Sequence, residues 1–198
     1  MAEPLPDFRD WSHLAKGSAD QRRAHAVLSR HLPFDRLAGF DSGLAGTFPI
    51  DIAIPGSDLD ILVQADDPAG LAPLLDQQFG TEEGYARRLI QVADGPALVA
   101  GFTLDGLPVE IFVQAVPVER QTGWRHMVVE ARLLALAPAL RGEIRTLKLD
   151  GMKTEPAFAH LLGLAGDPYA ALLLLERQGD TVLCDLLVRR RAAMPKKG

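Results

Sequence analysis

The chain has 198 residues, of which 47% are hydrophobic and 24% are charged, so it can bury one sizeable hydrophobic core. Its formal net charge of −5 argues against binding of duplex nucleic acid and favours a small substrate. No apolar run reaches the roughly 18 to 20 residues of a membrane span, and residues 1–10 are acidic and proline-containing rather than signal-like, so a cytoplasmic protein with no membrane partner is expected.

The first predicted element is an amphipathic helix over residues 18–32. Ser18 and Gln21 have the spacing of a capping box. One face of this helix carries Ala24, Val27, Leu28 and His31. A short apolar segment, residues 40–45, follows.

A strand is predicted over Asp58–Gln64, after a stretch interrupted by proline and glycine. Next, Asp67 and Pro68 supply an N-cap and a first-turn proline. The helix that they begin is expected to end near Phe79 and Gly80.

Three β-like runs come next, over residues 86–92, 97–104 and 107–113. The turn dipeptides Asp94-Gly95 and Asp105-Gly106 separate them. Connections this short join antiparallel strands, so the three runs are expected to form an antiparallel meander.

After Pro117 the hydrophobic period becomes helical. Helices are predicted over residues 119–137, 141–153, 156–164, 168–178 and 181–190. The sequence therefore predicts an α+β fold in which a mixed or antiparallel sheet flanked by helices, residues 1–117, is followed by a helical C-terminal subdomain, residues 118–198.

Two features near the C-terminus have simple readings. Cys184 is the one cysteine, so it forms no internal disulfide, and its leucine neighbours predict a core position. The basic tail, residues 189–197, suits either a phosphate backbone or the negative end of the preceding helix and solvent.

Asp58 and Asp60 are the first candidate site residues. They are two positions apart on a predicted strand, so both side chains leave the same face with Cα atoms roughly 7 Å apart. Like charges about 5 Å apart repel by roughly 3 kcal/mol at an effective dielectric constant near 20, so such a pair tends to hold a proton or bind a cation. Mg²⁺ prefers oxygen ligands and completes its coordination with water and substrate phosphates, which fits a site of carboxylates. As an alternative, an aspartate at the edge of a strand simply caps a turn.

Glu110 is a third candidate carboxylate. It lies in the middle of the run over residues 107–113, on the opposite face from Val109 and Ile111. An acid in mid-strand is costly to bury without a partner. If this strand lies beside the strand of Asp60, Glu110 can reach the same metal ions; the alternative is a solvent-facing position on a half-exposed strand.

Gly46 and Thr47 stand where an apolar segment gives way to a turn that is able to open a short helix. Bare backbone N–H groups at such a point, together with the Thr47 hydroxyl, can hold a phosphate.

The segment from Leu44 to Ile61 resembles the signature of the DNA polymerase β nucleotidyltransferase superfamily. In that signature a hydrophobic-Gly-Gly/Ser element precedes Asp-x-Asp by about a dozen residues, and here Gly46 precedes Asp58 by twelve. The run Ser57–Ile61 is similar to the Ser-Asp-Ile-Asp-Leu run of minimal, aminoglycoside and tRNA nucleotidyltransferases. The resemblance implies that Asp58, Asp60 and Glu110 bind metal and catalyse, and that Gly46, Thr47 and Ser57 contact the nucleotide.

The whole chain, including residues 151–158 and 166–169, also resembles a bacterial family, domain of unknown function 4269, that is grouped with this superfamily. Two departures from the superfamily pattern stand out. Thr47 replaces the usual Ser or Gly, and Ile50-Asp51 stands where Arg-Gly is usual.

Arg125 and Lys153 are candidate nucleotide contacts, because in the resembling enzymes the C-terminal helices often close over the nucleotide and a basic side chain there can pair with phosphate oxygens. The alternative for Lys153 is a helix cap or a salt bridge at a helix end.

The resemblance, together with these residues, implies a nucleotidyltransferase that depends on Mg²⁺ or Mn²⁺ and moves a nucleoside monophosphate (NMP) group from a nucleoside triphosphate (NTP) to an acceptor, expected to be a small molecule or a protein. Because Ile50-Asp51 lacks the expected basic residue, the alternative is a non-catalytic module that binds a nucleotide or a partner.

Overall fold

The computed structural model describes residues 4–193, with side chains through Arg190; Lys196 and Lys197 of the basic tail lie outside this range. The chain divides into two compact units, one over Pro6–Trp124 and one that contains the helical region from Arg125 onward. No helix in the described part of the chain combines the length and the apolar character that a bilayer crossing requires.

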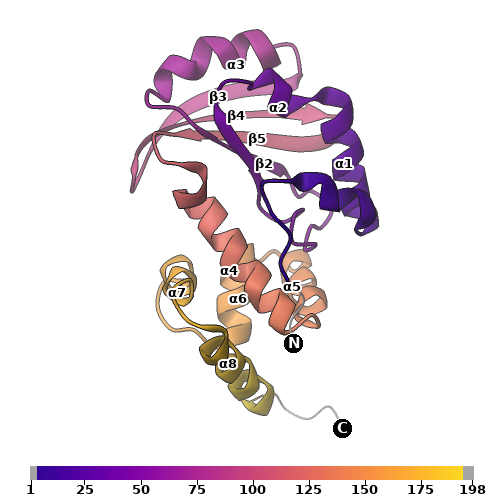
Figure 1. Ribbon diagram of the computed structural model, residues 1–198, viewed down its shortest axis with the longest axis vertical. Helices are drawn as coiled ribbons and strands as arrows, with labels where there is room; N and C mark the ends of the chain where they lie inside the picture. The colour runs from indigo at the N-terminus through magenta and orange to yellow at the C-terminus, as the bar shows by residue number, and fades with distance from the viewer. Residues whose placement is uncertain (1–3, 194–198) are drawn as a thin grey trace. The chain divides into compact units, whose positions relative to one another are not determined.

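The N-terminal unit is built on one five-stranded sheet with the strand order β1-β2-β5-β4-β3. Its strands are β1 (Asp41–Ala45), β2 (Leu59–Gln64), β3 (Glu83–Val92), β4 (Gly95–Leu104) and β5 (Leu107–Gln114). β2 and β5 are parallel, and the other neighbouring pairs are antiparallel. The expected meander and the α+β class are confirmed (Figure 1).

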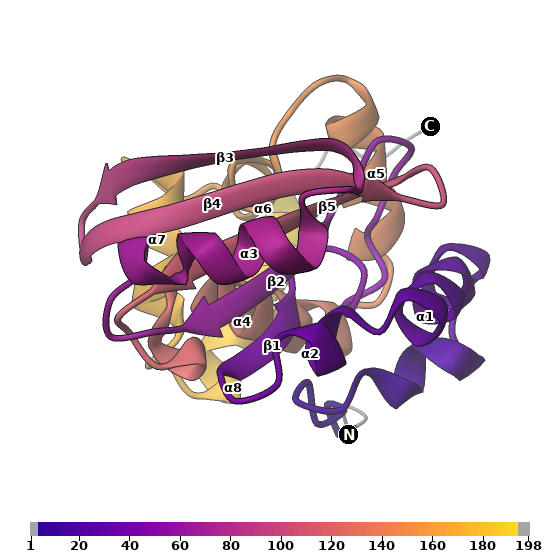
Figure 2. The same ribbon diagram turned by 90° about the horizontal axis from the view of Figure 1, so that it is seen from above.

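One face of the sheet carries the hydrophobic core of this unit. Helices α1 (Ala19–His31) and α3 (Ala72–Phe79) cover that face (Figure 2). From the central strands, the core takes alternate residues: Leu59, Ile61, Val63, Leu98, Ala100, Phe102, Val109, Ile111 and Val113. Because strand side chains alternate between faces, the residues between these belong to the opposite face.

Helix α1 begins with the capping box that the sequence predicts. The Ser18 hydroxyl accepts from the Gln21 backbone N–H at 3.3 Å, and the Gln21 carboxamide oxygen accepts from the Ser18 N–H at 3.1 Å. The amide nitrogen of the same Gln21 donates to the carbonyls of Phe48 and Pro49 at 3.0 and 3.3 Å. One residue thus caps the helix and anchors the turn that follows β1.

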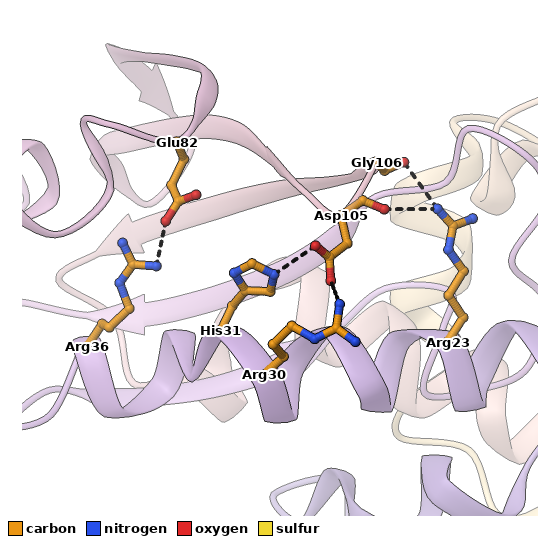
Figure 3. Close-up of polar contacts among 7 residues, drawn as sticks. All are labelled: Arg23, Arg30, His31, Arg36, Glu82, Asp105 and Gly106. Carbon is orange, nitrogen blue, oxygen red and sulfur yellow. Dashed lines mark hydrogen bonds and ion pairs between the residues drawn. The ribbon is translucent and has the colours of Figure 1, made fainter.

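Three side chains of α1 contact the β4–β5 turn (Figure 3). Arg30 and His31 form ion pairs with Asp105 at 2.6 and 3.2 Å, and Arg23 donates to the carbonyl oxygens of Asp105 and Gly106. The pKa of Asp105 is lowered first by its side-chain hydrogen bond with His31 and then by the charge of Arg30, while burial raises it. These contacts hold helix α1 against the turn between β4 and β5.

Two short helices complete this part of the N-terminal unit. Helix α2 (Pro33–Arg36), which was not predicted, ends at Arg36, and this side chain pairs with Glu82 at 2.7 Å (Figure 3). A 3-10 helix, η1 (Trp11–Lys16), was also not predicted. Both elements are short, and neither has enough residues to show a hydrophobic period.

Part of the second sheet face is covered within the N-terminal unit. Gln121, after the short helix η3 (Val118–Arg120), donates from its amide to the Val63 and Val116 carbonyls at 3.0 Å each. Gly123 packs near Leu62. These contacts lie toward the C-terminal end of β2, away from Asp60.

The helical unit contains α5 (Leu140–Leu149), α6 (Thr154–Leu162), α7 (Pro168–Leu175) and α8 (Asp180–Ala193), and it begins within α4 (Thr122–Leu136). Helix α6 packs against α5, α7 and α8. The expected core position of Cys184 is wrong, because this residue is exposed. Helix α8 buries Leu183 and Leu187, four residues apart, and Cys184 is rotated about 100° from Leu183 around the helix.

Candidate active site

Asp60 and Glu110 are direct neighbours on the parallel strands β2 and β5. Their flanking residues, Leu59 and Ile61 on β2 and Val109 on β5, belong to the core. Both carboxylates therefore leave the opposite face, with their Cα atoms about 4.8 Å apart across the ladder. The structure brings together two acids that are fifty positions apart in the sequence.

Asp58 immediately precedes β2 and is exposed. Burial raises the pKa of Glu110 above its usual value, the negative charge of Asp58 raises it further, and the nearby Arg88 guanidinium lowers it. Asp58 and Glu110 thus influence each other electrostatically, and a positive charge placed between them would be stabilised.

A tight turn fixes where Asp58 stands. The Ser57 N–H donates to the Ile54 carbonyl at 2.9 Å, and the Ser57 hydroxyl accepts from the Ile54 N–H at 3.0 Å. Between them are Pro55 and Gly56, and the φ of +89° at Gly56 is typical of a type II turn. In this structure the Ser57 hydroxyl serves the turn, and its contact with a nucleotide stays a prediction.

Gly46 directly follows β1 and lies against Asp60. Its φ is +76°, and a Cβ atom built on it would overlap the carboxylate oxygen Oδ2 of Asp60. Ala45 is the register partner of Asp60, which explains the close approach. A residue with a side chain at position 46 would therefore displace the carboxylate as well as strain the backbone.

Thr47 carries a polar atom without a partner. Its hydroxyl oxygen is buried and makes no hydrogen bond among the described residues. A buried hydroxyl without a hydrogen bond lowers the stability of the folded state by about 1 to 3 kcal/mol, so the Thr47 hydroxyl destabilises the fold. The position next to Gly46 and Asp60 fits a hydroxyl that is satisfied only when a ligand binds.

The segment after Thr47 is a hydrogen-bonded turn, and no helix opens there. The Ile52 N–H donates to the Thr47 carbonyl at 3.0 Å, and Asp51 has a φ of +60°. This left-handed conformation explains why the superfamily pattern has glycine at that position. Ile50, in place of the usual arginine, is buried with 4% exposure and brings no positive charge to the site.

The two predicted basic residues belong to the helical unit. Arg125 forms a two-pronged ion pair with Glu176, with its Nη2 at 2.5 Å from Oε2, and this pair lowers the pKa of Glu176. Lys153 is exposed at the N-cap of α6 and makes no capping bond with its side chain. The contact of either residue with a phosphate stays a prediction.

A divalent metal ion is the group that these acids suggest. Within the described part of the chain, no three His, Cys, Asp or Glu side chains are arranged to hold an ion by themselves. Mg²⁺, however, commonly takes only one or two carboxylates and fills its remaining positions with water and substrate phosphates. The oxygen donors of Asp60 and Glu110, with Gly46 against Asp60, fit an ion that is bound together with a triphosphate.

Arg88 on β3 was not among the candidate residues. Its Nη2 lies 3.6 Å from Oε2 of Glu110. The sequence shows Arg88 within a β-like run, but the pairing of β3 with β4 and of β4 with β5, which brings it to Glu110, depends on strand register that no local pattern specifies.

Solved structures with a similar fold include polymerases that act on RNA ends. The Cid1 poly(U) polymerase with Mg 3'-dATP bound matches with a TM-score of 0.50 and 14% identity over 79% of this chain and 48% of that chain. Cid1 described for RNA terminal uridylyl transferase activity matches with a TM-score of 0.49 and 15% identity over 79% of this chain and 46% of that chain. The GLD-2/RNP-8 complex matches with a TM-score of 0.46 and 16% identity over 95% of this chain and 72% of that chain.

These likenesses concern the fold alone. The chain spans about half the length of the Cid1 structures, with coverage of 46% to 48%. No curated protein matches the chain in sequence.

The family comparison covers most of the sequence. The family model described as domain of unknown function (DUF4269) matches residues 26–175, which include β1 through α7 and all three acids. The chain therefore belongs to the DUF4269 family, and its fold is similar to that of the Cid1 poly(U) polymerase.

Proposed function

We propose that this protein is a metal-dependent nucleotidyltransferase that moves an NMP group from an NTP to an acceptor hydroxyl. The proposal rests on the side-by-side placement of Asp60 and Glu110 on β2 and β5, with Gly46 against Asp60 and Thr47 next in the chain after Gly46. Acids on neighbouring strands beside a bare backbone turn suit a site that binds a cation and a phosphate together.

In this proposal the turn at Gly46 and Thr47 binds the triphosphate. Backbone N–H groups and the Thr47 hydroxyl donate to phosphate oxygens, which gives the hydroxyl the partner that it lacks. Because Gly46 has no side chain, the phosphates can approach the carboxylate of Asp60 closely.

Asp58, Asp60 and Glu110 are assigned to the reacting end of the nucleotide. A bound Mg²⁺ or Mn²⁺ would neutralise charge on the phosphates and lower the pKa of an acceptor hydroxyl. The acceptor oxygen attacks the α-phosphorus in line, its bond to phosphorus forms as the bond to pyrophosphate breaks, and Glu110 accepts the hydroxyl proton. Positioning and charge neutralisation supply most of the rate enhancement in such a reaction.

The acceptor is proposed to be a small molecule or a protein side chain. The net charge of −5 disfavours the long basic track that a duplex would need. An RNA end, on which the structurally similar Cid1 poly(U) polymerase acts, is a further acceptor to test.

The first test needs no knowledge of the acceptor. Binding of a nonhydrolysable NTP is measured by calorimetry with and without Mn²⁺, for the wild type, for Asp60→Asn and for Asp94→Asn. Asp94 is an exposed residue of the β3–β4 turn, where asparagine fits equally well, so Asp94→Asn is the matched control. We expect Asp60→Asn to lose the Mn²⁺-dependent part of the affinity and Asp94→Asn to keep it; equal affinities in all three proteins would refute the assignment of Asp60.

The second test is pyrophosphate release from a panel of NTPs with Mg²⁺ or Mn²⁺ and with small-molecule, protein and RNA acceptors. Turnover that disappears in Asp60→Asn and persists in Asp94→Asn supports nucleotidyl transfer.

The absence of a basic residue from Gly46 to Asp60 favours a second candidate, a module that binds a nucleotide without catalysis. Mn²⁺-dependent binding without pyrophosphate release from any NTP and acceptor would support that candidate.

A further inference from the structure

Arg88 reaches the acids from the edge of the sheet. In the register, Arg88 on β3 pairs with Val99 on β4, while Glu110 on β5 pairs with Gly101 on β4. Val99 and Gly101 are two positions apart, so their side-chain directions are on one face. The Arg88 side chain therefore shares a face with Glu110 and reaches it diagonally across β4.

Gly101 leaves space on β4 for the Arg88 side chain to reach Glu110. It is the β4 partner of Glu110 and has no side chain, and a Cβ atom built on it would have as its neighbour only the Val109 carbonyl oxygen at 3.9 Å. A larger residue here would stand between Arg88 and Glu110.

The contact between Arg88 and Glu110 is one that a competing cation can break. Its 3.6 Å separation is longer than a hydrogen bond, and the Arg88 side chain is 62% exposed. The neighbouring Arg87, by contrast, makes two hydrogen bonds to Asp76 at 2.6 and 2.8 Å. Arg88 thus lies near an acid without being fixed to it.

The charges around Glu110 explain why a cation lies there. Asp60 is the direct neighbour of Glu110 across the ladder, and Asp58 immediately precedes the strand of Asp60. The neighbouring carboxylates of Asp60 and Glu110 repel each other, and the Arg88 guanidinium beside Glu110 offsets part of that repulsion.

We propose that Arg88 is a built-in counter-ion for the three acids, which pairs with Glu110 while no divalent cation is bound and is displaced when a cation binds. This inference rests on the proposed function. Arg88 is in this sense a positioning residue: it offsets the charge of Glu110 in the metal-free protein, and it competes with the cation for the same carboxylate. A guanidinium displaced in this way remains beside the site, where it can pair with an anionic group of the substrate.

The test is the affinity for Mn²⁺ alone, measured by electron paramagnetic resonance of the free ion at fixed ionic strength. Arg88→Gln removes the counter-ion. Arg87→Gln is the matched control, since it removes the same charge from the adjacent residue of the same strand, whose partner is Asp76 on α3. Asp60→Asn identifies the binding that belongs to the site.

We expect Arg88→Gln to bind Mn²⁺ about two- to fivefold more tightly than the wild type, the range that corresponds to an exposed ion pair. Arg87→Gln should match the wild type, and Arg88→Lys should fall between the wild type and Arg88→Gln. In an Arg88→Gln, Glu110→Gln double variant the gain should disappear, because the carboxylate for which the two cations compete is gone.

The outcomes separate this inference from the proposed function. Mn²⁺ binding that depends on Asp60 but is equal in Arg88→Gln and Arg87→Gln, or is weaker in Arg88→Gln than in the wild type, overturns the role of Arg88 and leaves the proposed function standing. Absence of Asp60-dependent binding from every variant contradicts the metal site itself, and the role of Arg88 with it.

Discussion

At the scale of single residues, Gly46 lets the backbone after β1 come close to Asp60. Two properties act there together: a φ of +76°, and a Cβ position that the Asp60 carboxylate already occupies. Gly56 has a φ of +89° but open space around its Cβ position, so it shares the first property without the second.

We predict that Gly46→Ala and Gly56→Ala each lose roughly 1 to 2 kcal/mol of stability from backbone strain, and that Gly46→Ala loses more because Asp60 must move. Urea unfolding followed by tryptophan fluorescence measures this, since Trp11 and Trp124 both lie in the N-terminal unit. Mn²⁺-dependent binding of a nonhydrolysable NTP should fall in Gly46→Ala alone. Equal loss of nucleotide affinity in both variants would contradict a specific role for Gly46.

A substitution at Thr47 is expected to affect the stability of the fold and the affinity for nucleotide differently. Thr47→Val keeps the shape of the side chain and removes a buried hydroxyl that has no partner, so the variant should be as stable as the wild type or more stable by about 1 kcal/mol. Its nucleotide affinity should fall, because the hydroxyl is assigned to a phosphate. Thermal unfolding and calorimetry check the two halves; a destabilised variant that binds nucleotide normally would show that the hydroxyl serves the fold instead.

The residues of the site differ in how far the sequence predicts them. The spacing from Gly46 to Asp60 lies within one short segment, so a signature finds it. Glu110 follows from alternation on one strand. Arg88 does not, because its contact with Glu110 depends on the register of three strands, and the pairing of Arg125 with Glu176 depends on how α4 and α7 pack.

At the scale of elements, local signals predict most of the fold. The capping box at Ser18 and the two Asp-Gly turns place α1 and the meander within a few residues of the observed bounds. The parallel pairing of β2 with β5 has no local signal, since forty-two residues separate Gln64 from Leu107. That pairing is the one that creates the site.

The helical unit contains a buried acid with no catalytic assignment. Glu130 on α4 is 3% exposed, and burial, followed by the negative charge of Glu155, raises its pKa well above the usual value, while Lys148 lowers it. The folded protein therefore keeps the Glu130 proton at pH values where the unfolded chain has lost it.

The sign of the pH dependence follows from that raised pKa. The contribution of Glu130 to stability is fully present below the unfolded-state pKa of about 4.5 and declines as the pH rises toward the folded-state value. Glu130→Gln does not titrate, so its stability relative to the wild type should increase from pH 4.5 to pH 8. Urea unfolding followed by circular dichroism across this range tests the point; a relative stability that is constant or decreases with pH would contradict a protonated Glu130.

At the scale of the whole molecule, the chain has an α+β architecture similar to that of the Cid1 poly(U) polymerase and belongs to DUF4269. A buried Ile50 stands where the superfamily pattern has a basic residue. A reaction that runs without that charge has to draw its charge neutralisation from the divalent cation and from basic residues elsewhere in the chain.

Asp60 and Glu110 are proposed to bind a divalent cation together with a triphosphate that lies on Gly46 and Thr47. The anomalous electron density of Mn²⁺ in crystals grown with a nonhydrolysable NTP would show this arrangement directly. We expect a Mn²⁺ peak within about 2.2 Å of oxygens from both carboxylates and from the triphosphate, with a phosphate oxygen in hydrogen-bond distance of the Thr47 hydroxyl. A triphosphate bound elsewhere, or a Mn²⁺ peak that neither Asp60 nor Glu110 contacts, would contradict it.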